Sequence, residues 1–292
     1  AEPQFVFDGD DSWSEPTFRF AADYSFTDRV IGYGSWARGF RSGGYDGRAS
    51  TLEGVSSTFD PETVDTYELG LRMDLWGQRL RLNPTVFYSK YDDKQEERLI
   101  SGVGPGGLPR PDTTTVNAAE ASIWGAELEL LVNLSERFLI RGSLGYLDSE
   151  FDKFLDPNPI SLVLEDISDT AELRRVPKWT YDVGADYRWP LRGGTLTASV
   201  HYSYRDDYFS SPVRRQADPL GRDKAPDLSR TDFFLDFEMP LQDPDTRLTL
   251  SAFLKDAFGD KVRRLGATNA GLFWFGQRAA GRQWGLELTL SH

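Results

Sequence analysis

Residues 63–75, with the sequence TVDTYELGLRMDL, alternate between large apolar side chains and polar or small ones. The apolar set is Tyr67, Leu69, Leu71, Met73 and Leu75, and the intervening set is Thr66, Glu68, Gly70, Arg72 and Asp74. Because successive side chains of a β-strand point to opposite faces, this pattern predicts a strand with one apolar and one polar face. The same division recurs at residues 179–189, 196–205, 233–239 and 284–290. The sequence therefore predicts an all-β protein.

The alternation extends over most of the chain and predicts about eleven or twelve antiparallel strands in meander order. We expect strands at 16–26, 29–40, 63–75, 79–98, 113–133, 137–150, 177–190, 194–209, 230–240, 246–257 and 282–291. The segments between them alternate in length. Short turns are expected at 27–28, 76–78, 135–136, 191–194 and 242–245, and long loops at 41–62, 99–112, 151–176, 210–229 and 258–281. Short turns at one end and long loops at the other are typical of a transmembrane β-barrel, with periplasmic turns and extracellular loops.

Composition agrees with a barrel and excludes several other classes. Mean hydropathy is -0.48, and no apolar run is long enough for a membrane-spanning helix. Aromatic residues make up 13% of the chain, as expected where rings line two membrane boundaries. The chain has no cysteine, which rules out disulfides and thiolate sites. Its net charge of -13 argues against nucleic acid as a partner.

Alternation alone leaves open which face is buried, because a soluble ligand-binding barrel has the same period with the opposite sense. The number of strands and the rings near strand ends favour the membrane barrel. These rings belong to Tyr24, Phe26, Trp76, Tyr187, Trp189, Tyr202 and Tyr204. A soluble sandwich that binds sugar is a third reading, and it would stay monodisperse without detergent.

Several blocks of the sequence resemble the TonB-dependent outer-membrane receptors, in that family's order and over nearly the whole chain. The two most specific blocks are YGSWARGFRSGGY at 33–45 and FDPETVDTYELGL at 59–71. Further similar blocks are VFYSKYDDKQ at 86–95, NAA at 117–119, GAELE at 125–129, GYLD at 145–148 and LKDAFGD at 254–260. The resemblance implies the C-terminal half of a receptor barrel in the bacterial outer membrane.

Members of that family have a plug domain inside a 22-stranded barrel, and a segment before the plug engages the TonB energy-transducing complex. We expect residues 1–292 to form a single β-barrel domain without the plug, so that TonB would act through a plug domain not in this chain. Counting back from the last strand places residue 1 on the outer side. His292 stands where the family usually ends in Phe or Trp, a departure that bears on barrel assembly.

The resemblance implies a receptor for the energised uptake of a scarce nutrient such as a ferric siderophore or cobalamin. Expected partners are outer-membrane lipid, the TonB complex and a small-molecule or metal-chelate ligand. We expect no enzyme activity and no cofactor. The alternative function is a smaller, self-contained barrel that acts as a passive pore or adhesin. A pore would conduct ions steadily, whereas a gated receptor would not.

Ligand capture in such a receptor is expected from the outer loops, through rigid rings and Arg side chains. The candidates on the first long loop are Arg38, Arg41 and Tyr45. Those on the last are Phe273, Trp274 and Phe275, for which an aromatic girdle or a folded loop core is the other interpretation.

No catalytic residue or metal site is expected. His201 lies between Ser199 and Ser203 on the polar face of its strand, and we interpret these residues as lumen lining rather than a hydrolase site. The acidic stretches at 148–156 and 165–169 match no calcium-loop spacing, and a solvated outer loop is the favoured interpretation. The lumen charges expected to hydrate the interior and bind a plug are Glu68, Arg72, Glu127, Glu129, Asp182, Asp186 and Glu287.

Overall fold

The computed structural model describes residues 7–47, 49, 51–103, 109–157, 163–210, 224–241, 243, 246–259, 263–269, 273–278 and 280–291. Its main element is one antiparallel sheet with the strand order β1-β2-β5-β6-β7-β8-β10-β11-β14-β15-β18. These strands are β1 (Phe18–Thr27), β2 (Val30–Arg41), β5 (Glu62–Leu75), β6 (Leu80–Val103), β7 (Pro109–Ser135), β8 (Phe138–Pro157), β10 (Trp179–Leu191), β11 (Gly194–Arg205), β14 (Leu228–Pro240), β15 (Arg247–Lys255) and β18 (Gln283–Ser291).

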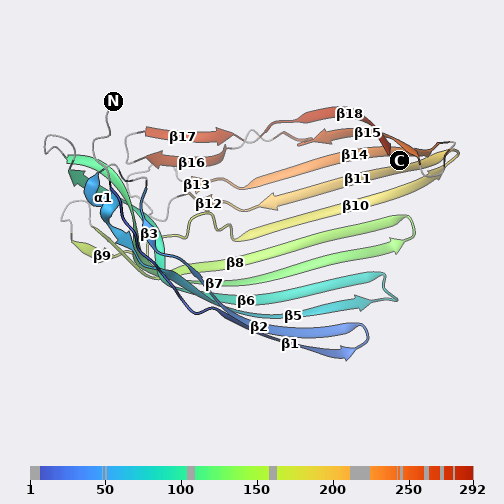
Figure 1. Cartoon of the computed structure of the whole chain (residues 1–292). Coiled ribbons are helices and arrows are strands. Elements are labelled where there is room, and N and C mark those ends of the chain that lie inside the picture. The colour runs from blue at the N-terminus through green and yellow to red at the C-terminus, as the bar shows by residue number, and fades with distance from the viewer. Residues whose placement is uncertain are drawn as a thin grey trace.

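Small elements occupy the connections at one end of the sheet, as Figure 1 shows. The first connection holds β3 (Gly44–Tyr45), the single-turn helix α1 (Leu52–Ser56) and β4 (Thr58–Phe59). The others hold β9 (Leu164–Asp166), which pairs with β8, and two hairpins. The hairpins are β12 (Tyr208–Phe209) with β13 (Lys224–Ala225), and β16 (Arg263–Asn269) with β17 (Phe273–Arg278).

The predicted meander of eleven strands with alternating short and long connections is confirmed. Three strands extend further than predicted. β6 reaches Val103, β7 begins at Pro109, and β8 ends at Pro157. The β6–β7 register continues to the pair Val103 and Pro109. The added residues are LISGV at 99–103, PRPD at 109–112 and FDKFLDP at 151–157. They do not alternate regularly between apolar and polar side chains, so the pattern that marks a strand with one apolar face is lost although the backbone pairing continues.

The sheet is strongly curved but does not close on itself. Among the described residues, β1 pairs only with β2, and β18 pairs only with β15. Figure 1 shows the two edge strands at opposite borders of the curved sheet. Each edge strand therefore keeps one row of backbone groups that no described strand satisfies.

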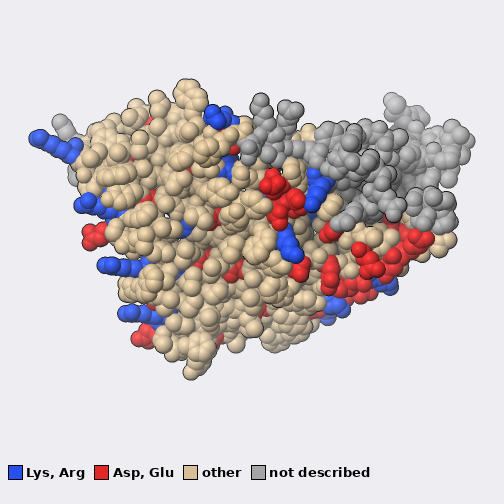
Figure 2. Space-filling model, turned by 180° about the vertical axis from the view of Figure 1, so that it is seen from behind, with Lys and Arg blue, Asp and Glu red and all other residues tan. Residues whose placement is uncertain are grey.

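The register assigns every strand residue to one of two faces, because directly paired residues in an antiparallel sheet lie on the same face. We call the face that carries Tyr67 and Trp179 the apolar face and the opposite one the polar face. Tyr67 is 51% exposed and Trp179 is 41% exposed, so neither row is packed against protein. Figure 2 shows one side of the molecule, on which the strand region has few charged side chains, whereas Lys and Arg gather at the turn end and Asp and Glu near the loops.

Side chains on each face pair across neighbouring strands. On the polar face, the hydroxyls of Thr66 and Ser89 lie 2.9 Å apart, and Arg141 forms an ion pair with Asp186. On the apolar face, ring centroids of Trp36 and Tyr67 lie 6.3 Å apart in a stacked arrangement. The polar face thus carries hydrogen-bonding groups, and the apolar face suits contact with hydrocarbon.

Candidate ligand-binding site at the loop end

Segment 163–178 is packed onto the polar face of the sheet near its loop end. Its Leu173 joins a buried cluster with Ala119, Ala121, Phe151 and Phe154. Ala121 pairs with Phe151, and the β7–β8 register runs from this pair to Glu127 without a break. Ala121 and Glu127 are an even number of residues apart on β7, so they lie on the same face, which is the polar face. The segment therefore covers part of the inner wall at the mouth of the lumen.

Asp166 fixes this segment to β8. Its Oδ1 accepts hydrogen bonds from the backbone N–H groups of Phe154 and Ser168, each at 3.0 Å. These hydrogen bonds hold the pKa of the Asp166 carboxyl below its usual range, the bond from Phe154 being the larger cause. The carboxylate form is therefore part of what fastens the segment to the wall.

A second set of polar contacts ties the first long connection to the β6–β7 hairpin. The Asn117 amide donates to the carbonyl oxygens of Asp60 and Asp93, both at 2.8 Å, and accepts from the Asp60 N–H at 2.7 Å. The buried amide of Gln95 donates to the carbonyl oxygens of Ser42 and Asp60. The first connection is thus held at both its ends.

Glu96 brings a buried carboxylate into this region, with 2% of its surface exposed. It forms an ion pair with Lys94, and its other oxygen lies 3.7 Å from the guanidinium of Arg174. Two cations thus compensate the buried charge, and one of them, Arg174, links the hairpin to segment 163–178.

A group of cations and rings lies where β11 ends, and we call Arg175, Arg205, Tyr208, Phe209 and Lys224 the mouth cluster. The Arg205 guanidinium is 4.3 Å from the centroid of the Tyr208 ring, and the Lys224 ammonium is 5.4 Å from that of Phe209. The backbone N–H of Arg175 donates to the Phe209 carbonyl at 2.8 Å, which joins the cluster to segment 163–178. Lys224 also forms an ion pair with Asp207 at 2.8 Å.

Arg205 combines an inward position with an unused donor. Arg205 pairs with Thr180, which lies on the same face of β10 as Asp182 and Asp186. Arg205 is therefore on the polar face. One of its terminal nitrogens, Nη2, donates to the Pro226 carbonyl at 2.8 Å, whereas Nη1 is buried without a hydrogen-bond partner in the part of the chain that the structure describes. A buried guanidinium N–H without a partner can donate to an anionic oxygen of a ligand.

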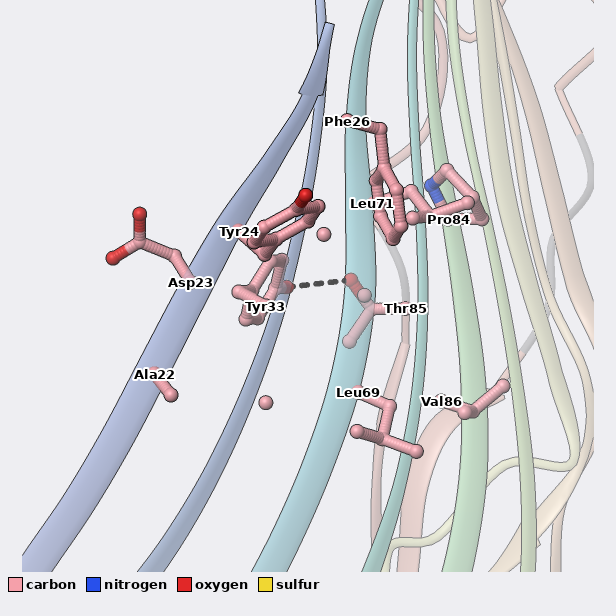
Figure 3. A pocket seen from close by; sticks show the side chains of 13 residues that line it. Ala22, Asp23, Tyr24, Phe26, Tyr33, Leu69, Leu71, Pro84, Thr85 and Val86 are labelled. Carbon is pink, nitrogen blue, oxygen red and sulfur yellow. Dashed lines mark hydrogen bonds between the residues drawn. The ribbon is translucent and has the colours of Figure 1, made fainter.

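A groove lies elsewhere, on the apolar face near the turn end. It has a volume of about 560 Å³ and is lined by side chains of β1, β2, β5 and β6. Figure 3 shows Phe26, Leu69, Leu71 and Val86 around it, while the Asp23 carboxylate points away from them. The groove is therefore separate from the lumen and from the mouth cluster.

Within the described ranges, no helix is long and apolar enough to cross a membrane. The same residues contain no group of three or more His, Asp or Glu side chains placed to hold a metal ion.

The family model described as TonB dependent receptor-like, beta-barrel matches residues 3–289. The chain belongs to the TonB-dependent receptor family. Receptors of this family are bacterial outer-membrane proteins. The match favours a receptor over the alternative of a small pore or adhesin.

Two curated receptors are related in sequence. The probable TonB-dependent siderophore receptor PiuA of Acinetobacter baumannii is 28% identical over 110 residues, which are 38% of this chain and 13% of PiuA. The metal-pseudopaline receptor CntO of Pseudomonas aeruginosa is 26% identical over 177 residues, or 58% of this chain and 22% of CntO. The chain thus spans less than a quarter of either relative.

A solved structure confirms the fold. The ferric yersiniabactin uptake receptor FyuA from Yersinia pestis superposes with a TM-score of 0.66 and 18% identity, over 94% of this chain and 36% of FyuA. The two share the receptor barrel fold.

The sequence-predicted candidates are dispersed in this receptor. Arg38 lies on the apolar face, where its guanidinium forms a 3.1 Å ion pair with Asp65. Arg41 is exposed at the last position of β2. The half-buried Tyr45 packs edge-on against Phe7 and Trp13. Phe273, Trp274 and Phe275 belong to β17, but their side chains lie outside the described residues. A ligand role for these six residues stays a prediction.

Sequence reasoning missed the mouth cluster of the receptor. The predicted strand at 194–209 includes the motif RDDYF at 205–209, whereas β11 ends at Arg205. The available signal was the loss of apolar alternation after Tyr204, together with two adjacent aspartates that are unfavourable in a strand.

Proposed function

We propose that this chain forms part of the wall and outer mouth of a receptor for energised uptake of a ferric siderophore. The names of PiuA and FyuA support the ligand class, since one is a probable siderophore receptor and the other a ferric yersiniabactin uptake receptor. Cobalamin is the less favoured cargo, because the names of PiuA and FyuA point to siderophores. The receptor carries out transport without covalent chemistry.

The observation that carries the proposal is the buried, unpaired Nη1 of Arg205 beside the ring of Tyr208. Ferric siderophores present anionic oxygen atoms, and many carry aromatic rings. A guanidinium donates to such oxygens with charge-assisted hydrogen bonds, and a neighbouring ring stacks on the organic part. The mouth cluster offers both groups on the lumen side of the wall.

We further propose that a plug domain from outside residues 1–292 occupies the polar face and links the receptor to the TonB complex. The polar face supports this proposal through its acids and arginines, such as the pair of Arg141 and Asp186. Weak exposed pairs contribute little one at a time, but many together can seat a domain.

The test measures binding of ferric siderophores to the full-length receptor by quenching of intrinsic fluorescence. The ligands are ferric yersiniabactin, a ferric catecholate and a ferric hydroxamate. We expect at least one to bind, and Arg205→Gln to weaken its binding about 10-fold, the equivalent of about 1.4 kcal/mol. Arg188→Gln, on the same face near the turns, is the matched control and should bind like the wild type.

Equal affinity of the wild type and the Arg205→Gln variant would remove the mouth cluster from the site. Failure of all three chelates to bind the wild type would contradict the siderophore proposal.

A further inference from the structure

We propose that the groove on the apolar face binds an anionic phospholipid of the periplasmic leaflet. One acyl chain would lie in the groove, and the headgroup phosphate would lie at Arg29 and Arg79 in the adjoining turns. This inference depends on the membrane location of the wall and is independent of the nutrient that the receptor imports.

Two glycines of β2 let apolar side chains of the neighbouring strands pack directly over its backbone. A Cβ atom at Gly32 would lie 2.6 Å from the Phe26 ring, and one at Gly34 would lie 2.9 Å from a methyl carbon of Leu69. Without side chains at these two positions of β2, the apolar side chains of its neighbours approach the backbone directly. The groove is therefore bounded by Phe26 and Leu69 together with other side chains of β1, β5 and β6.

The groove continues along β2 toward the loop end. A second stretch of about 430 Å³ shares Ala22, Gly34 and Leu69 with the first and ends among the rings of Trp36 and Tyr67. The two stretches adjoin and together form an almost wholly apolar surface along β2. This surface suits an extended hydrocarbon chain, because a groove lined almost wholly by apolar atoms binds its occupant mainly through shape and burial.

The turn end of the groove supplies positive charge. Arg29 follows β1, and Arg79 precedes β6, so the two turns flank the strands that line the groove. The backbone carbonyl of Arg29 accepts from the Asp74 N–H at 2.9 Å, which brings the start of β2 beside the end of β5. Figure 2 shows Lys and Arg projecting at this end of the molecule.

Neither arginine is neutralised by an ion pair among the described residues, and both are exposed. Asp74, an acid near these turns, forms an ion pair with Arg81 at 2.9 Å. The acid next to Arg29 in sequence is Asp28, which is exposed. Trp76, 70% exposed, lies in the same β5–β6 turn as Arg79. Tryptophan at the headgroup level beside arginine is a favourable setting for a phosphate diester at the membrane boundary.

The occupant follows from the position of the groove. The apolar face meets outer-membrane lipid, and the short turns lie at its periplasmic boundary. A lipid whose chain enters from that boundary places its phosphate among the turns, where the arginines are. Charge complementarity therefore selects an anionic headgroup over a zwitterionic one.

The experiment titrates the full-length receptor in detergent with palmitoyl-oleoyl phosphatidylglycerol and counts bound lipids by native mass spectrometry. Palmitoyl-oleoyl phosphatidylethanolamine is the comparison lipid. We expect the double variant Arg29→Gln/Arg79→Gln to weaken the tightest phosphatidylglycerol binding at least fivefold. We expect Ala22→Leu, which narrows the groove, to have a similar effect.

Two matched controls separate this site from general charge and general hydrophobicity. Arg192→Gln removes an exposed arginine from the β10–β11 turn, and Ala198→Leu enlarges an alanine on the apolar face of β11. Both should bind phosphatidylglycerol like the wild type. Three outcomes would each overturn the proposal. The first is an equal loss of phosphatidylglycerol binding in Arg192→Gln and in the double variant, and the second is equal binding of the two lipids by the wild type. The third is wild-type phosphatidylglycerol binding by Ala22→Leu. Siderophore binding by the same variants shows independently whether the receptor site is intact.

Discussion

At the scale of single residues, Asp166 is the side chain whose ionisation most directly controls a structural contact. Its lowered pKa means that the folded segment favours the carboxylate more than the unfolded chain does. The resulting stabilisation is present above the unfolded-state pKa, about 3.9 for Asp, and is lost as the pH falls through the lower folded value. Segment 163–178 should therefore loosen only in acid.

We predict that Asp166→Asn loosens segment 163–178 at neutral pH and removes the acid dependence of its packing, because an amide oxygen is a weaker acceptor than a carboxylate. Hydrogen exchange of residues 163–178 between about pH 3 and pH 7 measures this. Asp169→Asn, three residues away on the exposed side, is the control and should retain the wild-type profile. An unchanged profile in Asp166→Asn would show that apolar packing alone holds the segment.

Single ligand residues were the least predictable feature from the sequence. Arg38 looked like a capture residue because it begins a run of Arg, Gly and Tyr, but Asp65 binds both its guanidinium and the indole N–H of Trp36, at 3.1 and 3.0 Å. That pairing joins residues on two strands. Sequence alternation places a residue on a face and does not reveal its partner across the sheet.

At the scale of elements, the β6–β7 hairpin does more than cross the membrane. Beyond Tyr91 its register shifts, and Asp93 adopts a positive φ of 54°. Such a bulge turns the following side chains, and Gln95 and Asn117 then hold the first long connection. Strands were predictable where one face meets lipid, but their extensions and the small hairpins depend on these contacts between distant segments.

We predict that Asn117→Ala frees the first connection, residues 42–61, because it removes three hydrogen bonds of about 1 kcal/mol each. Limited proteolysis of the full-length receptor should cut this segment several times faster in the variant. Asn83→Ala removes a single 3.2 Å hydrogen bond to Glu129 near the turn end and is the control. Identical cleavage of both variants would mean that other contacts hold the connection.

At the scale of the whole molecule, the separation of an apolar from a polar face accounts for both the fold and its location. Residues 1–292 contain no cysteine, so an introduced cysteine is unique within this chain, and the receptor without it gives the background reaction. In receptor embedded in cells, we predict that Leu69→Cys resists a water-soluble maleimide, because its side chain lies in hydrocarbon. Thr58→Cys, in the extracellular connection, should react fully as the positive control.

Glu68→Cys reports on the other face. In the intact receptor we expect intermediate labelling, because a plug would cover the lumen wall only in part, and faster labelling once the plug is deleted. Labelling of Leu69→Cys as fast as that of Thr58→Cys would contradict the assignment of the apolar face to lipid.

The distribution of connection lengths separates the parts of this protein that can change from those that cannot. An insertion in a two-residue turn would shift the register of two strands, whereas an insertion in an extracellular loop leaves the sheet unaltered. The loop end is also the part that antibodies and bacteriophages can reach. Variation that escapes such recognition can therefore accumulate there while the wall in the membrane keeps its sequence.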